Sequence, residues 1–447
     1  MKKVIYSLLI ASLVASSCGK KLDLLPQQSV AEEVALNSDA NVKKVLNGAY
    51  DALSIGDLYG GNVSLYAELL AADDEIRWEG TFNEPREIWL KQMITTNSFV
   101  RDTWIEGYKT INVANNILSA IAVVDPGDQD RVEGEALFIR AAVYFELVKF
   151  YAKPFSDGNA SSNPGLPLIL TPTRGIDANS YVARSTVANT YAQIITDLTE
   201  AENLLPEEND VYATKAAAAA LLSRVYLQQG DYAGARDAAN RAITAATNAG
   251  LSLVTDYADA FNNTENSSED IFAIQVSDQD GDNSMHLYCS IPDFGGRDGD
   301  VSIQQKHLDL YTPGDDRLNL FYVGAGGTRT GKWKQQYRVI PVIRLSEMYL
   351  TRAECNFRLG TTVGDTPIND LNQTRSRAGI ASPTITLDAI LLERKLELAH
   401  EGQAVHDLRR LKNSADGFAY NANEMVFPIP QREIDATNGV VVQNPGY

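Results

Sequence analysis

The sequence contains few cysteines, few histidines and fewer basic than acidic residues, and each shortage removes a class of function. Its 447 residues include 3 cysteines and 4 histidines, with no C-x-x-C spacing, which leaves no disulfide framework and no cysteine-ligated zinc site. The 39 Lys and Arg against 58 Asp and Glu give a formal net charge of −19, and no dense basic run offsets it. Because an acidic surface repels phosphate backbones, we expect no nucleic-acid partner.

Long apolar runs are also missing, apart from one short run at the N-terminus. Residues 1–17 consist of a basic start, an apolar stretch of 12 residues that is too short to span a bilayer, and small residues that lead to Cys18. This order predicts a bacterial lipoprotein signal, whose cleavage would leave Cys18 lipidated at the start of a tether over residues 18–37. Ala15 departs from the usual leucine, so an ordinary secretory signal is the alternative. No other run of 18 or more apolar residues exists, which predicts a protein anchored to a membrane rather than spanning it.

The remaining cysteines, Cys289 and Cys355, are expected to be ordinary residues. Cys355 lies within the helical pattern of Ser346–Leu359 and is interpreted as a small buried apolar side chain. A disulfide bond between the two cysteines is the alternative.

Apolar residues recur at helical spacing along most of the chain. Two such stretches, around Ile111–Ile121 and Ala136–Leu147, flank the turn sequence Asp125-Pro126-Gly127, which predicts an antiparallel helix pair. Composition is that of a globular protein, and the length allows one large domain or two to three smaller ones.

The segment Thr214–Ala246 is more specific. An alanine-rich helix over Ala216–Gln229 ends at Gly230, and small residues then recur at helical spacing after the turn. These features are typical of a tetratricopeptide-like unit, which either binds partners along a concave face or serves only as scaffold. Neighbouring segments of similar pattern are Trp104–Tyr151, Val187–Leu205 and Val342–Leu359. The predicted fold is therefore mainly α, with tetratricopeptide-like helix pairs as a scaffold.

Loops rich in glycine, proline and asparagine interrupt the helical pattern. The longest such region, Asn262–Pro341, contains the β-rich runs Asp270–Val276 and Leu318–Val323, and a shorter one covers Pro154–Arg184. Loops on a rigid scaffold commonly display binding groups, so the sequence predicts a loop-rich, partly β ligand-binding region here.

Motifs of catalysis are incomplete. Gly326–Lys332 fits the start of a P-loop, but Trp333 cannot supply the Mg²⁺-binding hydroxyl, and strand and loop rather than a helix follow. His400-Glu401 and His406 have the wrong spacing for a zinc helix, because six residues place two side chains about 120° apart. Paired glycosidase carboxylates cannot be recognised, since their pairing is spatial. We expect a protein without enzymatic activity, and a surface hydrolase is the remote alternative.

No cofactor is expected, with one weak exception. Asp278, Asp280 and Asp282, followed by Asn283, could offer oxygen ligands to Ca²⁺, although the glycine and glutamate positions of an EF-hand do not fit. A solvated acidic loop is the alternative.

Several blocks in the C-terminal half carry a family resemblance. The segment Leu371–Gly379, LNQTRSRAG, is similar to an LNxxRxRAG block, and Glu393–Arg410 is similar to an ERRxELAFEG…DLRR block. Further blocks are Ile340–Glu347, Phe427–Pro430 and the terminal Gln443–Tyr447, with Glu133–Ala141 and Gly165–Leu168 earlier in the chain. Together they resemble the SusD/RagB family of surface nutrient-binding lipoproteins. The departures are His400 for the usual Phe, and Ala404-Val405-His406 for a common Arg-aromatic-aromatic run.

The resemblance implies a single SusD-like domain over residues 38–447, with an N-terminal helical part (38–261) and a C-terminal part (262–447). It also implies a non-catalytic protein, lipid-anchored to the outer membrane and facing the cell surface. Such a protein would capture oligosaccharides, or peptides in the alternative, and deliver them to a SusC-like TonB-dependent transporter. The many Glu and Arg residues of the shared blocks are interpreted as ion pairs between helix faces rather than as ligand groups.

Sugars are bound by flat aromatic faces together with planar polar side chains, so we searched the loops for both. An early cluster comprises Asp74, Arg77, Trp78 and Trp89, and the glycine-rich region supplies Tyr288, Phe294, Arg297, Trp333 and Tyr337. Our hypothesis is that Trp78, Tyr288 and Trp333 form one aromatic surface. The alternative is that each ring belongs to the core.

Overall fold

The computed structural model describes residues 35–175, 180–279, 281 and 283–447. The predicted signal, the lipidation site Cys18, most of the tether, and the weak calcium candidates Asp280 and Asp282 lie outside these residues.

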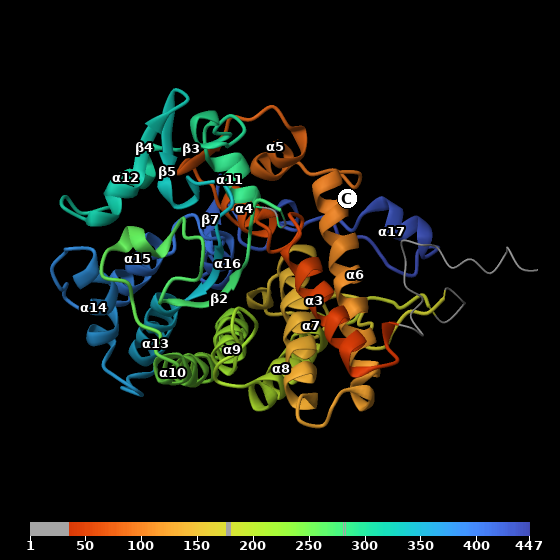
Figure 1. Cartoon of the computed structure of the whole chain (residues 1–447). Helices are drawn as coiled ribbons and strands as arrows, with labels where there is room; N and C mark the ends of the chain where they lie inside the picture. Colours follow the sequence, from red (N-terminus) through yellow and green to blue (C-terminus); the bar gives the residue numbers. More distant parts are fainter. Residues whose placement is uncertain (1–34, 176–179, 280, 282) are drawn as a thin grey trace, which may run out of the picture.

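A layered array of helices forms the scaffold in the lower half of Figure 1. Successive helices pack side by side in the order α6, α7, α8, α9, α10 and α13, with α3 against α6 and α7. Their bounds are α3 Asp39–Ser54, α6 Ser98–Ser119, α7 Gln129–Tyr151, α8 Val187–Leu204, α9 Lys215–Gln229, α10 Tyr232–Asn248 and α13 Leu345–Leu359. The helices α14 (Pro367–Arg377) and α15 (Leu387–Glu397) continue the array on α13. The prediction of a mainly α fold built from tetratricopeptide-like pairs is confirmed.

The α9–α10 pair follows directly from its sequence. The alanines of α9 are buried, which lets the neighbouring helices approach closely. Gly230 ends α9 in the left-handed conformation (φ 76°), which glycine adopts without steric cost. Asp231 then caps α10, because its carboxylate accepts a hydrogen bond from the backbone N–H of Gly234 at 2.9 Å.

Short helices and strands cover the scaffold at the top of Figure 1. Four strands form an antiparallel sheet in the order β1-β3-β5-β4, and β2 pairs with β6. The strand bounds are β1 Ile76–Trp78, β2 Asp270–Ile274, β3 Val301–Ile303, β4 Phe321–Gly324, β5 Gly327–Thr330, β6 Ile340–Arg344, β7 Ser414–Ala415 and β8 Phe418–Ala419. The helices of this part are α4 Asn62–Leu70, α5 Asn83–Leu90, α11 Ser284–Cys289, α12 Gln305–Leu308, α16 Ala404–Arg410 and α17 Gln431–Ala436.

Of the two predicted β-rich runs, one is correct and one is only partly so. Asp270–Val276 contains β2, whereas the strand predicted over Leu318–Val323 begins only at Phe321. A 3₁₀ turn precedes it, because the Asp315 carboxylate accepts hydrogen bonds from both the backbone N–H and the guanidinium of Arg317. The buried ion pair therefore overrides the local β propensity.

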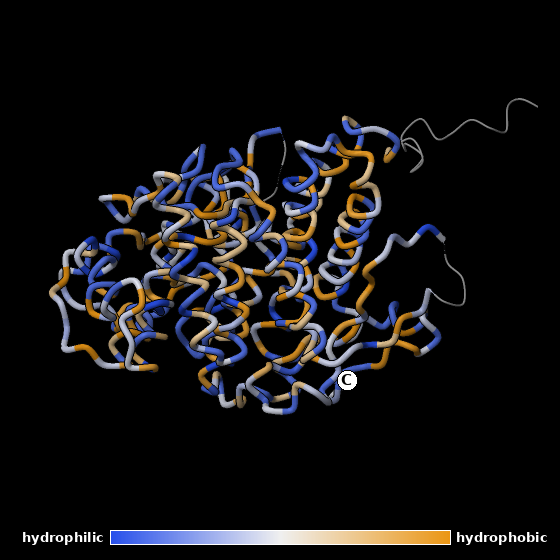
Figure 2. The backbone as a smooth tube through the Cα atoms, turned by 90° about the horizontal axis from the view of Figure 1, so that it is seen from below, coloured by the Kyte–Doolittle hydropathy of each residue, from blue (hydrophilic) through white to orange (hydrophobic). Residues whose placement is uncertain are grey.

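One hydrophobic cluster contains residues from Val42 to Val441, and Figure 2 shows apolar and polar segments alternating along its helices. The C-terminal segment completes this cluster. Phe427 stacks on Phe150 with ring centroids 5.1 Å apart, and the Asn444 amide donates to the carbonyl of Tyr151 at 2.8 Å. Within the described ranges, the helices are all too short or too polar to cross a membrane.

Charged residues of the shared sequence blocks form a buried network. Arg344 contacts Glu269, Glu397 and Glu401, and each of these side chains is at most 6% exposed. Arg317 likewise joins Asp315 to Glu393, and Arg224 binds Glu347. The interpretation of these blocks as structural ion pairs is confirmed.

Cys289 and Cys355 are both buried, and neither forms a disulfide bond. Burial raises the pKa of both thiols, that of Cys355 to about 12. The structure therefore supports the interpretation of ordinary buried residues and not the disulfide alternative.

Candidate functional site

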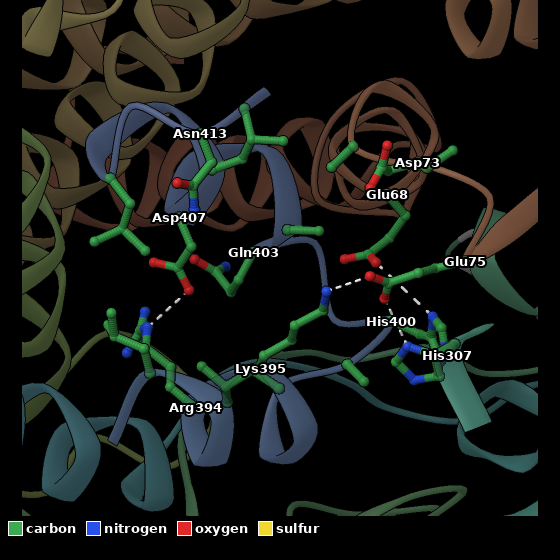
Figure 3. A pocket seen from close by; sticks show the side chains of 18 of the residues that line it. Glu68, Asp73, Glu75, His307, Arg394, Lys395, His400, Gln403, Asp407 and Asn413 are labelled. Atoms are coloured by element: carbon green, nitrogen blue, oxygen red, sulfur yellow. Dashed lines mark hydrogen bonds and ion pairs between the residues drawn. The ribbon is translucent and has the colours of Figure 1, made fainter. Parts of the chain in front are cut away.

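A cavity of about 530 Å³ opens between α15, α16 and the segment that joins α4 to β1 (Figure 3). This α15–α16 cavity is lined on one side by Ala71, Ala72, Asp73, Glu75 and Ile76 and on the other by residues from the segment 391–414. It has the size of an ordinary small-molecule site.

Two carboxylates and two imidazoles meet at one end of the α15–α16 cavity (Figure 3). His307 Nδ1 lies 2.9 Å from Glu75 Oε2, and His400 Nδ1 lies 3.8 Å from Glu68 Oε2. The ring centroids of His307 and His400 are 4.8 Å apart. Burial lowers the pKa of His307 to about 4 and that of His400 to about 3, so both rings are neutral at pH 7.

The two carboxylates carry opposite pKa shifts. Burial raises the pKa of Glu68 to about 7. Burial also acts on Glu75, but the hydrogen bond from His307 and the charge of Lys395 outweigh it and lower the pKa of Glu75. Opposite shifts are the pattern of a catalytic acid and base.

Both carboxylates are nevertheless committed to the protein. Glu68 is 7% exposed and accepts a hydrogen bond from the backbone N–H of Gly402 at 2.8 Å. Glu75 holds both His307 and Lys395. The arrangement therefore supports binding better than proton transfer to a substrate. Among the residues that the structure describes, no group of three His, Cys, Asp or Glu side chains is arranged to hold a metal ion.

Ion pairs also tie the walls of the α15–α16 cavity together. Arg394 on α15 donates to Asp407 on α16 at 2.9 Å, and Arg410 donates to the same carboxylate at 2.6 Å. Gln403 lies beside the Arg394–Asp407 pair (Figure 3); it is 9% exposed, and its side-chain amide forms no hydrogen bond with any described residue. Leucines of α15 and α16 form the apolar part of the lining, namely Leu391, Leu392, Leu398, Leu408 and Leu411.

The three aromatic residues of our hypothesis are buried, so they do not form one exposed surface. Trp78, Tyr288 and Trp333 are 2%, 6% and 3% exposed. Trp78 and Tyr288 are in contact, with ring centroids 5.6 Å apart. The indole N–H groups of Trp78 and Trp333 both donate to backbone carbonyls, that of Trp78 to the carbonyl of Phe82. The Trp333 N–H donates to the carbonyl of His400 at 2.7 Å. These rings fill space between elements, which is the alternative that we gave for each.

A residue outside our predicted set provides an exposed ring beside Tyr288. Phe82 is 40% exposed, contacts Tyr288, and carries the guanidinium of Arg297 4.1 Å from its ring centroid. Arg297 is held in place by Asp300 at 2.7 Å and by Thr81. We call this group the Phe82 face. It could have been found by searching the loop between Trp78 and Trp89 for every aromatic residue rather than for tryptophan.

The other predicted ligand residues are scattered. Phe294 is half-buried and lies under Lys334, whose Nζ is 4.2 Å from its ring centroid, and Tyr337 is 43% exposed. Asp74 and Arg77 are exposed, and Trp89 is half-buried against the core. Their roles as ligand contacts stay predictions.

The other motifs have structural explanations or remain untested. Lys332 of the incomplete P-loop is buried in an ion pair with Glu401 at 2.6 Å, and a 3₁₀ turn over Gly331–Trp333 follows β5. Asp278 is exposed. Calcium binding with Asp280 and Asp282 stays a prediction.

Two family models match the chain. One, described as "Starch-binding associating with outer membrane", matches residues 20–227, and the other, described as "SusD family", matches residues 317–426. The chain belongs to the SusD/RagB family. The resemblance inferred from the sequence blocks is thereby confirmed.

Similar proteins cover most of the SusD/RagB chain. The SusD-like protein P2 of Formosa agariphila is 25% identical and covers 100% of this chain and 99% of its own length. The starch-binding protein SusD of Bacteroides thetaiotaomicron is 27% identical over 71% of this chain and 73% of its own. Among solved structures, a putative sugar-binding protein of Bacteroides vulgatus has a TM-score of 0.82 at 28% identity, covering 92% of this chain and 99% of that one. A SusD superfamily protein of B. thetaiotaomicron has a TM-score of 0.81 at 26% identity, covering 91% and 100%.

The α15–α16 cavity was not predicted from the sequence, although the sequence contained a signal for it. The chain departs from the usual SusD/RagB blocks at His400 and at Ala404-Val405-His406. His400 lies at the end of the cavity and Ala404 lines it, so the short alanine side chain leaves space that a larger residue would fill. Departures from a family block thus pointed to the cavity, whereas the search for aromatic residues in loops did not.

Proposed function

We propose that this chain is a cell-surface lipoprotein that binds a glycan and delivers it to a SusC-like TonB-dependent transporter in the outer membrane. The observation that carries the proposal is the match over residues 20–227 to a family described as starch-binding and associated with the outer membrane. The predicted lipoprotein signal ending at Cys18 agrees with that location.

The Phe82 face is the site that we assign to the glycan. It combines an exposed ring with a planar guanidinium that Asp300 holds in one orientation. Preorganised planar groups of this kind lose little conformational entropy when a sugar ring binds. The buried Trp78 and Tyr288 support Phe82 from below and keep the loop in place.

The elements around the Phe82 face, β1, α5 and α11, lie at the upper end of the helical scaffold in Figure 1, where Tyr288 contacts Phe99 of α6. We assign the contact with the transporter to the scaffold, since its use would leave the loops accessible to ligand. Replacing Cys18 by Ser should release the protein from the membrane fraction and abolish incorporation of labelled fatty acid. Continued labelling of the Cys18→Ser variant would contradict the lipid anchor.

Titration calorimetry with a panel of soluble polysaccharides tests glycan binding. We expect Phe82→Ala and Arg297→Ala each to weaken binding about threefold to tenfold, because an aromatic contact contributes about 0.5–1.5 kcal/mol. Phe357→Ala is the matched control, since Phe357 is 36% exposed on α13.

Three results would overturn parts of the proposal. Equal binding by all variants would remove the Phe82 face as the site. Binding of peptides and of no polysaccharide would favour the peptide alternative. Release of shorter products from a polymer, abolished by a single carboxylate substitution, would favour the hydrolase alternative.

A further inference from the structure

We propose that the α15–α16 cavity is a second ligand site, which binds a neutral ligand carrying a secondary amide next to an aliphatic group. Gln403 would hold the amide, and the leucines of α15 and α16 would contact the aliphatic group. This site is separate from the Phe82 face and does not depend on the glycan proposal.

Gln403 is one of the cavity's polar side chains without a partner among the described residues, and His400, through Nε2, is another. Gln403 as a whole is 9% exposed and its amide forms no hydrogen bond with the described residues, so the amide is available to a ligand in the cavity. In Figure 3 it lies between Asp407 and Lys395, inside the cavity. A carboxamide has an acceptor oxygen and two N–H donors, so its natural complement is another amide. Asn413, exposed at the rim, offers a second amide of the same kind.

The charged side chains of the cavity favour a neutral ligand. Lys395 is paired with Glu75, and Asp407 is shared by Arg394 and Arg410. A charged ligand would have to break one of these pairs, which costs more than it returns in a partly desolvated site. A neutral amide needs no such exchange.

The apolar part of the cavity consists of leucines, alanines and Ile76. Of the described lining residues, none is Phe, Tyr or Trp, so no aromatic face is available for stacking on a sugar ring. Leu392, which is 41% exposed, and Leu408 instead offer an aliphatic wall that suits a methyl or branched alkyl group. An amide beside an alkyl group occurs both in an N-acetylated sugar and in a short apolar peptide.

Titration calorimetry of the mature chain distinguishes these sources. The probes are N,N′-diacetylchitobiose, the end-blocked tripeptide Ala-Leu-Ala, and cellobiose, which has the same sugar skeleton as the first probe without its acetamido groups. We expect one or both amide-bearing probes to bind, and cellobiose to bind at least about tenfold more weakly, because a site built to hydrogen-bond a group rejects the analogue that lacks it. The better of the two amide probes names the source.

Variants connect the binding to the cavity. Gln403→Leu replaces the carboxamide by an apolar side chain of similar size and should weaken binding of the amide probe at least about tenfold. Asn413→Ala, at the exposed rim, should weaken this binding less. Phe357→Ala, at an exposed position on α13 outside both proposed sites, is the matched control and should leave it unchanged. Equal binding of cellobiose and diacetylchitobiose, no binding of either amide probe, or unchanged binding by folded Gln403→Leu would each overturn the inference. Polysaccharide binding that persists in such a case would leave the glycan proposal standing.

Discussion

Arg344→Met should strongly destabilise the protein, because it removes the centre of the buried ionic network. Arg344 is 1% exposed and donates to Glu397 and Glu401 at 2.9 and 2.8 Å, and it also binds Glu269. Methionine fills a similar volume but leaves these carboxylates with fewer partners. Removing one partner of a buried ion pair costs about 3–5 kcal/mol.

That single-pair figure applies although Arg344 has three partners. Arg377 also binds Glu269 and Glu397, and Lys332 also binds Glu401, so no carboxylate is left wholly unpaired. We therefore expect a loss of about 3–5 kcal/mol in the free energy of unfolding, measured by urea denaturation at pH 7.5. Arg241→Met is the control, since Arg241 pairs with Glu202 at the surface and is 47% exposed. A surface pair contributes at most about 1 kcal/mol.

The pH dependence gives an independent measurement. Burial acts to raise the pKa of Glu397, but nearby positive charges, foremost the guanidinium groups of Arg377 and Arg344, outweigh it and hold this pKa well below its ordinary value of 4.5. This stabilisation is present above pH 4.5 and is lost as the pH falls towards the lowered pKa. In Arg344→Met the pKa of Glu397 rises, so acid unfolding should begin at higher pH. Equal stability of the Arg344 and Arg241 variants, with the same acid midpoint, would refute the reasoning.

Three further predictions concern single sites. Burial raises the pKa of Glu68 from 4.5 to about 7, so the stability of the folded protein falls as the pH rises across that window. Glu68→Gln should therefore be more stable than wild type by up to about 3 kcal/mol at pH 8 but not at pH 4.5, and lower thermal stability of the variant at pH 8 would contradict this. A Cβ added at Gly402 (φ 79°) would lie 2.8 Å from the Cα of Ser64, whereas a Cβ at Gly417 (φ 83°) would meet open space. Gly402→Ala should therefore lower the melting temperature much more than Gly417→Ala, and equal shifts would count against this explanation. Because Cys289 and Cys355 are unbridged, dithiothreitol should leave the melting temperature unchanged, and a drop would indicate a disulfide bond.

The fold was predictable from the sequence where its signals are local. The end of α9 at Gly230 and the α6–α7 pair around Asp125-Pro126-Gly127 depend on nearby residues, so both could be predicted. The start of β4 could not, because the turn before it contains the buried Arg317, which binds Glu393, 76 residues away, as well as the nearby Asp315.

The site was less predictable because exposure depends on distant contacts. The sequence shows that Trp333 is aromatic but not that its N–H meets the carbonyl of His400, 67 residues away. The α15–α16 cavity is still less local, since Glu68 and Gly402 are 334 residues apart. The sequence shows which residues are aromatic or charged, whereas which of them are buried is known only from the packed structure.

The packing of the C-terminal segment on α7 has a consequence for the order of folding. Phe427 and Asn444 contact Phe150 and Tyr151, which are the last two residues of α7. A chain that crosses a membrane from its N-terminus lacks these last contacts until nearly all of it has emerged. Closing such long loops is slow. For the exported chain that we propose, this topology would delay completion of the core until translocation is almost finished.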